Sequence, residues 1–131
     1  FSLIEIIIVV TIMAILASVI APRLFTRVGE AKVSAAQSGC KGIAQQLTLY
    51  LTDEGISSID PDFDLETLLL PPDEGGGRNG PYLTKKTDLI DPWGEAYVLV
   101  VPGEVNYDFD IQSYGSDKQP GGEGENKDIT Q

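Results

Sequence analysis

The sequence predicts an α+β protein, in which one long N-terminal helix packs on a small antiparallel β-sheet that precedes a glycine-rich, acidic C-terminal loop. Three observations support this class: an apolar run over residues 2–22, helical periodicity over residues 23–52, and two β-rich segments late in the chain. We therefore expect a transmembrane segment at 1–22, an amphipathic continuation of the same helix at 23–52, and a globular head at 53–131.

The first segment, SLIEIIIVVTIMAILASVIAP, is long enough to cross a hydrocarbon core of roughly 30 Å as a helix. A secretory signal peptide would show a basic region, a shorter apolar stretch and a small-residue cleavage site. Here the first basic residue is Arg23, beyond the far end of the run. The pattern therefore indicates a membrane span.

Glu5 is the only charged side chain in this run. An ionised carboxylate inside a membrane costs about 3 kcal/mol or more and usually has a partner. Because no basic side chain precedes Arg23, the cation within reach is an N-terminal amine: if the mature chain begins at Phe1, the α-amino group of the same or a neighbouring copy neutralises Glu5. The alternative is that Glu5 reaches the membrane interface, since it lies only four residues from Phe1.

These N-terminal residues resemble a known signal. Phe1-Ser2-Leu3-Ile4-Glu5, followed by a β-branched apolar run, is similar to the class III signal of type IV pilins and type II secretion pseudopilins. The resemblance implies that a prepilin peptidase removes a basic leader and that the new N-terminal Phe1 is methylated. The usual second residue is Thr, and Ser2 keeps its hydroxyl.

From Pro22 onward the helix becomes amphipathic. Pro22 removes one backbone hydrogen bond, so we expect a kink or local unwinding near residues 15–22. Cys40, the only cysteine, excludes an internal disulfide and is expected to be a small buried packing residue. The predicted apolar stripe comprises Leu24, Val28, Ala31, Ala35, Ile43, Leu47 and Tyr50, widened by Val33, Ala36, Cys40, Ala44 and Leu51.

Gly55 is the predicted end of the helix. A short helix should follow, capped by Asp62 or Asp64 and with Leu65, Leu68 and Leu69 turned inward. Residues 71–81 contain three prolines and four glycines, and we expect a flexible surface loop without regular structure. They are not a phosphate-binding loop, because no Lys-Ser/Thr pair follows at the required spacing.

Two strands are predicted at residues 96–101 and 107–113, the second half-buried by its alternation. They should form an antiparallel sheet packed on the amphipathic helix. Trp93, in the turn 91–94, is expected to be a core aromatic whose indole N–H is hydrogen-bonded.

Charge is divided unevenly along the chain. Residues 1–52 carry a net charge of +2, whereas residues 53–131 carry 18 acidic and 5 basic side chains, a net charge of −13. Such a head repels nucleic acid. Its acidity also increases repulsion between copies in an assembly, which a bound cation would relieve.

The C-terminal loop, residues 113–129, is rich in glycine and oxygen-bearing side chains and contains no His or Cys. These donors favour a hard cation, Ca²⁺ ahead of Mg²⁺. The spacing is not that of an EF-hand. Composition alone favours a solvated, disordered acidic tail over a cation site.

A second resemblance covers nearly the whole chain. It is carried, in order, by Gly80-Pro81-Tyr82-Leu83, Asp91-Pro92-Trp93-Gly94, Tyr107-Asp108, Tyr114-Gly115-Ser116-Asp117, Gly121-Gly122-Glu123-Gly124 and Asp128-Ile129. These motifs are similar to those of the major pseudopilins of type II secretion systems, which have the type IV pilin-like fold.

The resemblance implies a Ca²⁺ held by the side chains of Asp117 and Asp128, with backbone carbonyls near Tyr114 and Ser116. Glu123 and Glu125 are weaker candidate ligands. A Trp that is typical of the family shortly after Asp-Ile is missing here, where Gln131 follows Ile129-Thr130. Lys127 is a further departure.

The resulting hypothesis is a structural subunit, not an enzyme, that polymerises into a helical pseudopilus and drives folded proteins through the bacterial outer membrane. Each copy would wait in the inner membrane as a single-pass protein with its head in the periplasm. Its partners would be further copies, minor pseudopilins and an inner-membrane assembly platform.

Two alternatives stay open. A type IV pilin of an adhesion, motility or DNA-uptake fibre shares the N-terminus but often closes its C-terminal region with a disulfide. A membrane-anchored hydrolase would use two carboxylates, yet the chain has no His and its acids lie in a glycine-rich tail.

Overall fold

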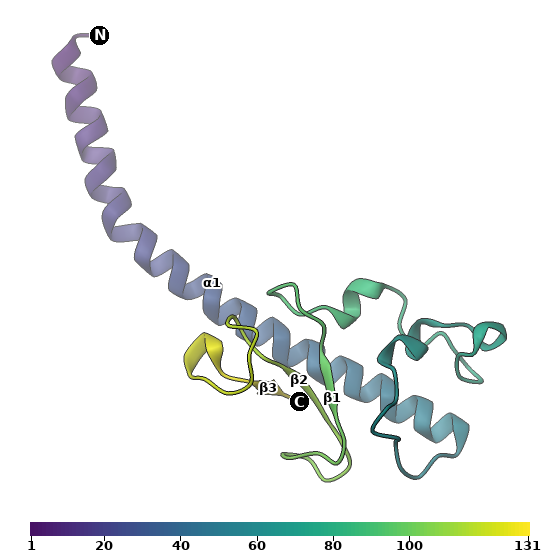
Figure 1. Ribbon diagram of the computed structural model, residues 1–131. Coiled ribbons are helices and arrows are strands. Elements are labelled where there is room, and N and C mark those ends of the chain that lie inside the picture. The colour runs from purple at the N-terminus through teal and green to yellow at the C-terminus, as the bar shows by residue number, and fades with distance from the viewer. The chain divides into compact units, whose positions relative to one another are not determined.

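The computed structural model describes residues 1–131, and its longest element is helix α1, Leu3–Glu54 (Figure 1). The chain divides into two compact units, Phe1–Ala31 and Lys32–Gln131, which we describe separately. The helix ends as predicted: Gly55 has φ +66°, a left-handed conformation that glycine adopts without strain. We predicted a kink or local unwinding near residues 15–22; the helix runs through Pro22 without interruption, so the unwinding is absent.

The second unit contains a three-stranded antiparallel sheet in the order β1-β2-β3. β1 (Val98–Val100) and β2 (Asp110–Ser113) lie within the two predicted strands but are shorter. Leu99 pairs with Ile111, and Ser113 pairs with Ile129 of β3 (Ile129–Thr130), a strand that was not predicted. All four residues of β2 are buried, so the prediction of a half-buried strand was wrong.

Gln131 extends the pairing of β3 with β2 through its side chain. Its amide oxygen accepts the Ile111 N–H at 2.6 Å, and its amide nitrogen donates to the Phe109 carbonyl at 3.1 Å. Gln131 therefore holds the end of the chain described here against the central strand.

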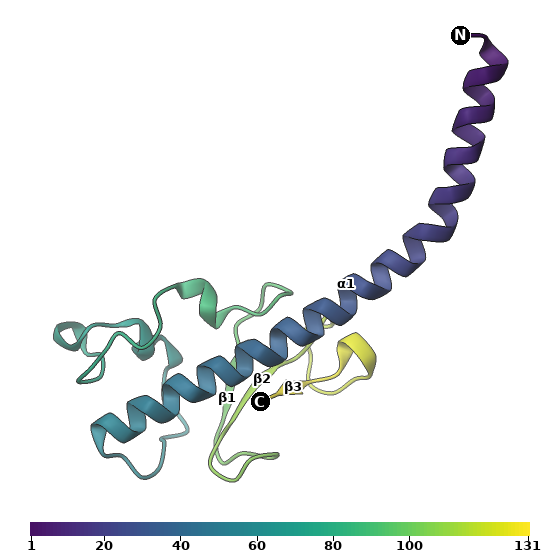
Figure 2. The same ribbon diagram turned by 180° about the vertical axis from the view of Figure 1, so that it is seen from behind.

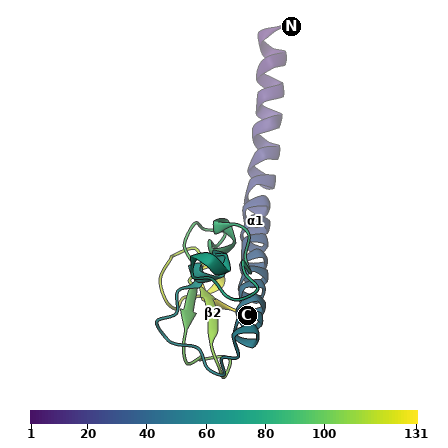
Figure 3. The same ribbon diagram turned by 90° about the vertical axis from the view of Figure 1, so that its right-hand side faces the viewer.

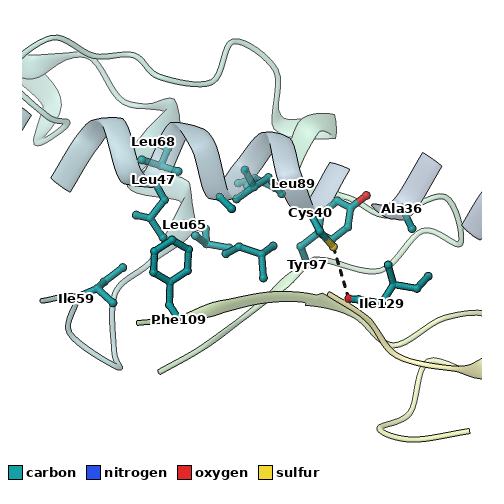
Figure 4. Close-up of a cluster of buried hydrophobic side chains, with 13 residues drawn as sticks. Ala36, Cys40, Leu47, Ile59, Leu65, Leu68, Leu89, Tyr97, Phe109 and Ile129 are labelled. Carbon is teal, nitrogen blue, oxygen red and sulfur yellow. Dashed lines mark hydrogen bonds between the residues drawn. The ribbon is translucent and has the colours of Figure 1, made fainter. Parts of the chain in front are cut away.

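The core of the second unit forms between α1 and the sheet. On α1, Ala36, Cys40, Ile43 and Leu47 are spaced by four, three and four residues and are almost completely buried. The strands and loops lie on one side of this part of α1 (Figure 3), and α1 crosses in front of the sheet in Figure 2. Facing the helix are Ile59, Leu65, Leu68, Leu89, Tyr97, Phe109, Ile111 and Ile129 (Figure 4).

The predicted apolar stripe is covered only in its second half. Leu24 and Val28 are 60% and 46% exposed, and Ala31 and Ala35 are exposed as well. Cys40, by contrast, is fully buried as predicted, and its thiol donates to the Ile129 carbonyl at 3.6 Å (Figure 4).

Three short 3₁₀ helices connect α1 to the sheet: η1 (Leu65–Leu69), η2 (Pro72–Glu74) and η3 (Lys86–Leu89). Asp64 caps η1 by accepting the Glu66 N–H at 2.9 Å, as predicted. The region 71–81 is more ordered than expected, because it includes η2 and because Gly77 is buried. A Cβ at Gly77 would lie 2.6 Å from the Tyr50 ring, so close packing requires this glycine.

Trp93 is half-buried at the edge of the core. Its backbone N–H donates to Asp91 Oδ1 at 3.0 Å. The predicted hydrogen bond from its indole N–H is absent. The ring is partly exposed, and its N–H is not among the buried groups that lack a partner.

Candidate functional site

The first candidate site is the surface of the N-terminal unit. Every residue from Phe1 to Ile20 is exposed, including large apolar side chains such as Ile7 at 54% and Val19 at 57%. By length and composition alone, α1 is long and apolar enough to cross a membrane. An uncovered apolar surface of this extent requires a lipid or protein environment.

Glu5 closes the first turn of α1 through a reciprocal pair of hydrogen bonds with Ser2. The Ser2 N–H donates to Glu5 Oε2 at 2.7 Å, and the Glu5 N–H donates to Ser2 Oγ at 3.3 Å. This is a capping box. Sequence reasoning missed it, although Ser-x-x-Glu before an apolar run is its signature. The ion pairs of this structure do not include Glu5 with the Phe1 amine.

The second candidate site is the C-terminal loop, which is closed by contacts between its two ends. The Ser116 N–H donates to the Glu125 carbonyl at 2.9 Å, and Ser116 Oγ donates to Asn126 Oδ1. Gly115, at φ +76°, lies so close to the Glu125 carbonyl that a side chain there would collide with it. The loop is therefore a defined structure, with a short turn η4 at Gly124–Asn126.

Asp117 and Asp128 both bind backbone N–H groups of the same turn. Asp117 Oδ1 accepts the Gln119 N–H at 3.2 Å, and Asp128 Oδ2 accepts the Gly121 N–H at 3.0 Å. Asp128 Oδ1 is buried and has no hydrogen-bond donor. Buried oxygens are rarely left unpaired in this way.

The oxygen atoms of this loop are compatible with a hard cation. The unpaired oxygen of Asp128 is an acceptor that a cation would satisfy. No three acidic side chains converge, so a cation here would also need backbone carbonyls. The predicted weaker ligands Glu123 and Glu125 have exposed side chains, while their carbonyls accept the N–H groups of Asn126 and Ser116.

Two further carboxylates, Asp91 and Asp110, are buried in the second unit and accept hydrogen bonds from its backbone and side chains. Asp91 Oδ1 accepts the N–H groups of Trp93 and Glu95, and its Oδ2 accepts the Ser113 hydroxyl at 2.7 Å. Both acids have their hydrogen bonds satisfied within the fold, so each has a structural role.

Asp110 holds the loop between β1 and β2. Its carboxylate accepts the N–H groups of Glu104, Val105 and Asn106 at 2.6, 2.8 and 2.9 Å, and the Asn106 side-chain amide at 2.8 Å. Burial alone would raise the pKa of Asp110, but these donors outweigh it and hold the pKa below its ordinary value. Sequence reasoning missed this residue, because an Asp in an alternating strand pattern is expected to face solvent.

Comparison with known proteins gives consistent matches. Residues 23–131 match the family described as type II secretion system protein G. The chain is 35% identical to the type II secretion system core protein G of Pseudomonas aeruginosa, over 98% of this chain and 91% of that protein. It is 34% identical to the protein of the same name from Vibrio cholerae, over 98% and 88% of the two chains. It is 31% identical to that of Xanthomonas campestris, over 98% and 85%.

Proposed function

Because the chain belongs to the type II secretion system protein G family, we propose that it is a structural subunit that polymerises into a helical pseudopilus and drives export of folded proteins across the outer membrane. It acts as a structural protein and not as an enzyme. The observation that carries this proposal is the apolar surface of residues 1–28, which the chain itself leaves exposed.

This surface has two successive environments in the proposal. Before assembly it lies in the inner membrane as a single span, with the head in the periplasm. In the pseudopilus it is buried against other copies, while minor pseudopilins and an inner-membrane platform direct assembly. Each environment removes the apolar side chains from water, so transfer between them needs little change in apolar hydration.

Glu5 selects the position of each incoming copy in this proposal. Its carboxylate is held by the Ser2 N–H and retains further acceptor capacity. The amine of Phe1 from a neighbouring copy, methylated after the prepilin peptidase has acted, would neutralise Glu5 where water is excluded. An unpaired carboxylate there is costly, so only a copy in the correct register enters the filament.

The test is to replace Glu5 with Ala in the full chain and to measure filament yield by electron microscopy of sheared fibres. We expect filament yield to be lost while the protein still inserts in the membrane with a folded head. Asp73→Ala is the control, because Asp73 is an exposed carboxylate of the head outside the apolar surface and the C-terminal loop. Normal filaments from Glu5→Ala would contradict the pairing, and the absence of filaments from the wild type would contradict the function.

Ca²⁺ binding in the C-terminal loop is the second part of the proposal. Asp117 and Asp128 would hold the ion with carbonyls near Tyr114 and Ser116, and its charge would offset part of the acidity of the head. The support is the unpaired buried oxygen of Asp128. A ligand that binds only the folded state raises its stability by about 2.7 kcal/mol at a concentration of 100 Kd.

This part is tested on the full chain in detergent micelles, by thermal unfolding followed through Trp93 fluorescence with CaCl₂ or EGTA. We expect the midpoint to rise with Ca²⁺, and the rise to disappear in Asp128→Asn and to shrink in Asp117→Ala. Asp73→Ala, an exposed acid outside the loop, should keep the full response. An identical midpoint with and without Ca²⁺ in the wild type would contradict a structural ion.

A further inference from the structure

The loop between β1 and β2 carries the most exposed large apolar side chains of the head. Tyr107 is 95% exposed and Val105 is 71% exposed. The loop extends past the ends of the two strands (Figure 1) and is flanked by the exposed carboxylates of Glu104 and Asp108. The segment Glu104–Asp108, which we call the acidic tip, therefore presents apolar groups between two negative charges.

Hydrogen bonds within the same copy fix the backbone of the acidic tip. The buried carboxylate of Asp110 accepts the N–H groups of Glu104, Val105 and Asn106, three successive residues of the tip. The side chains of Val105 and Tyr107 are thus presented by a fixed backbone. Preorganisation of this kind reduces the entropy lost on binding, and exposed aromatic residues on such a surface are typical binding anchors.

A groove lies behind the acidic tip. It has a volume of about 500 Å³ and is open to solvent between the tip residues Asn106–Asp108 and the α1 residues Lys41, Gln45 and Thr48. The acidic tip is therefore accessible from the groove between it and α1 as well as from the solvent. A helix or loop of another molecule can approach the tip along this groove.

The chain contains a second exposed segment with the opposite charge pattern. In Arg23–Val28, which we call the basic collar, Leu24 and Phe25 are 60% and 73% exposed. They lie between Arg23 and Arg27, both exposed. The one ion pair of the collar, Arg27 with Glu30 at 3.6 Å, is highly exposed, and such pairs contribute little. The collar thus remains available to a further acidic partner.

We propose that the acidic tip of one copy docks on the basic collar of a second copy, an inference that rests on the proposed polymerisation. Tyr107 and Val105 pack on Phe25 and Leu24, while the two carboxylates face the two guanidinium groups. The net charge of −13 on residues 53–131 makes contact between two heads repulsive, whereas contact of a head with a collar is attractive.

The geometry of this contact suits a filament. The two surfaces are different parts of the chain, so each copy can offer its tip to one neighbour and its collar to another. Such heterologous contacts generate rings or open helical polymers, unlike self-complementary contacts, which stop at a dimer.

Cross-linking between two tagged copies tests the proposal directly. Full-length Phe25→Cys and Tyr107→Cys are co-expressed with different tags and oxidised in assembled filaments. Cys40 can stay in place, because it is buried and burial raises the pKa of its thiol to about 12. We expect a disulfide-linked dimer carrying both tags, and none when Tyr107→Cys is replaced by Ile90→Cys, an exposed position elsewhere in the head.

Charge reversal provides the second measurement. Glu104→Lys with Asp108→Lys, and Arg23→Glu with Arg27→Glu, should each lower filament yield by about tenfold or more, because like charges then face one another. Combining all four changes should restore filaments to within about twofold of the wild type. Membrane insertion of each variant is verified by protease accessibility of the head.

The outcomes separate this inference from the proposed function. Wild-type filaments without the Phe25–Tyr107 cross-link, or without rescue by the fourfold swap, overturn the contact and leave polymerisation intact. A cross-link of Tyr107→Cys only to other proteins also overturns it. No filaments from the wild type would remove the proposed function itself.

Discussion

The two units of this chain differ in how much of their structure they complete alone. In residues 32–131 the apolar side chains on one face of α1 are buried in the core, and the buried carboxylates Asp91 and Asp110 have all the donors they need. In residues 1–31 almost every side chain is exposed, although most of them are apolar. The difference shows that the two halves of one helix have different roles: the second half organises a domain, and the first half is an exposed apolar surface, which in the proposed function contacts the membrane and neighbouring copies.

The strongest test of this contrast removes the carboxylate of Asp110. Asp110→Ala leaves three backbone N–H groups without an acceptor and removes the shorter of the two hydrogen bonds of the Asn106 amide, and we expect a loss of about 3–5 kcal/mol in the free energy of unfolding. Urea unfolding followed by Trp93 fluorescence measures it. The exposed neighbour Asp108 is the control, and its replacement by Ala should change stability by about 0.5 kcal/mol or less. Equal effects at both positions would contradict the proposed role of Asp110.

A second test compares leucines of the same helix. Leu47 is fully buried and Leu49 is 48% exposed. Leu47→Ala should lower stability by about 2–5 kcal/mol through lost contacts and a cavity, whereas Leu49→Ala should have an effect near the 0.5 kcal/mol typical of surface changes. In the first unit, Ile7→Ala should leave unfolding of the second unit unchanged. An effect of Ile7→Ala as large as that of Leu47→Ala would break the comparison between the units.

A third test uses two glycines that lie one turn apart on α1. A Cβ at Gly39 would collide with the Tyr97 hydroxyl, whereas a Cβ at Gly42 would meet nothing within 4 Å. Gly39→Ala should therefore lower stability by about 1–3 kcal/mol. Gly42→Ala should raise it by about 0.5–1 kcal/mol, because alanine favours the helix. Thermal unfolding of both variants gives the two signs, and a stabilising Gly39→Ala would show that Tyr97 is not fixed against the helix.

The smallest expected effect is a pH dependence. The pKa of Asp110 lies below its ordinary value in the folded protein because backbone donors favour its charged form despite burial. An Asp in the unfolded chain has a pKa of about 3.9. A lower pKa in the folded protein stabilises the fold above that value, and this stability is lost as the pH falls through the folded-state pKa. Stability should therefore decline below about pH 5, and less steeply in Asp110→Asn. The same slope in both proteins would assign the decline to other carboxylates.

Local sequence signals predicted the elements that local chemistry determines. Periodicity located α1 and the core position of Cys40, Gly55 marked the helix end, and the Asp64 cap followed from its side chain. β3 was not predicted, because its two residues form a strand only by pairing with Ser113 and Gln112, which lie elsewhere in the sequence. The burial of Asp110 was not predicted for the same reason. The N–H groups that donate to its carboxylate belong to a loop, and periodicity does not predict the path of a loop.

The candidate sites divide in the same way. The exposed apolar segment and Glu5 were predicted from composition, and the Ser2 capping box was readable but overlooked. The two ends of the C-terminal loop meet through the contact of Ser116 with Asn126, which depends on a turn between them. The ligation of Ca²⁺ by Asp117 and Asp128 stays a prediction.

The most direct test of the central claim is the solvent accessibility of residue 24, just beyond the membrane span, in monomers and filaments. Leu24→Cys, at a side chain that is 60% exposed in the single chain, is treated with a maleimide in detergent-dispersed monomers and in purified filaments. We expect rapid labelling of the monomer and protection in the filament, where other copies cover the first unit, while buried Cys40 stays unlabelled in both. Equal labelling of Leu24→Cys in monomer and filament would contradict burial of this surface by assembly.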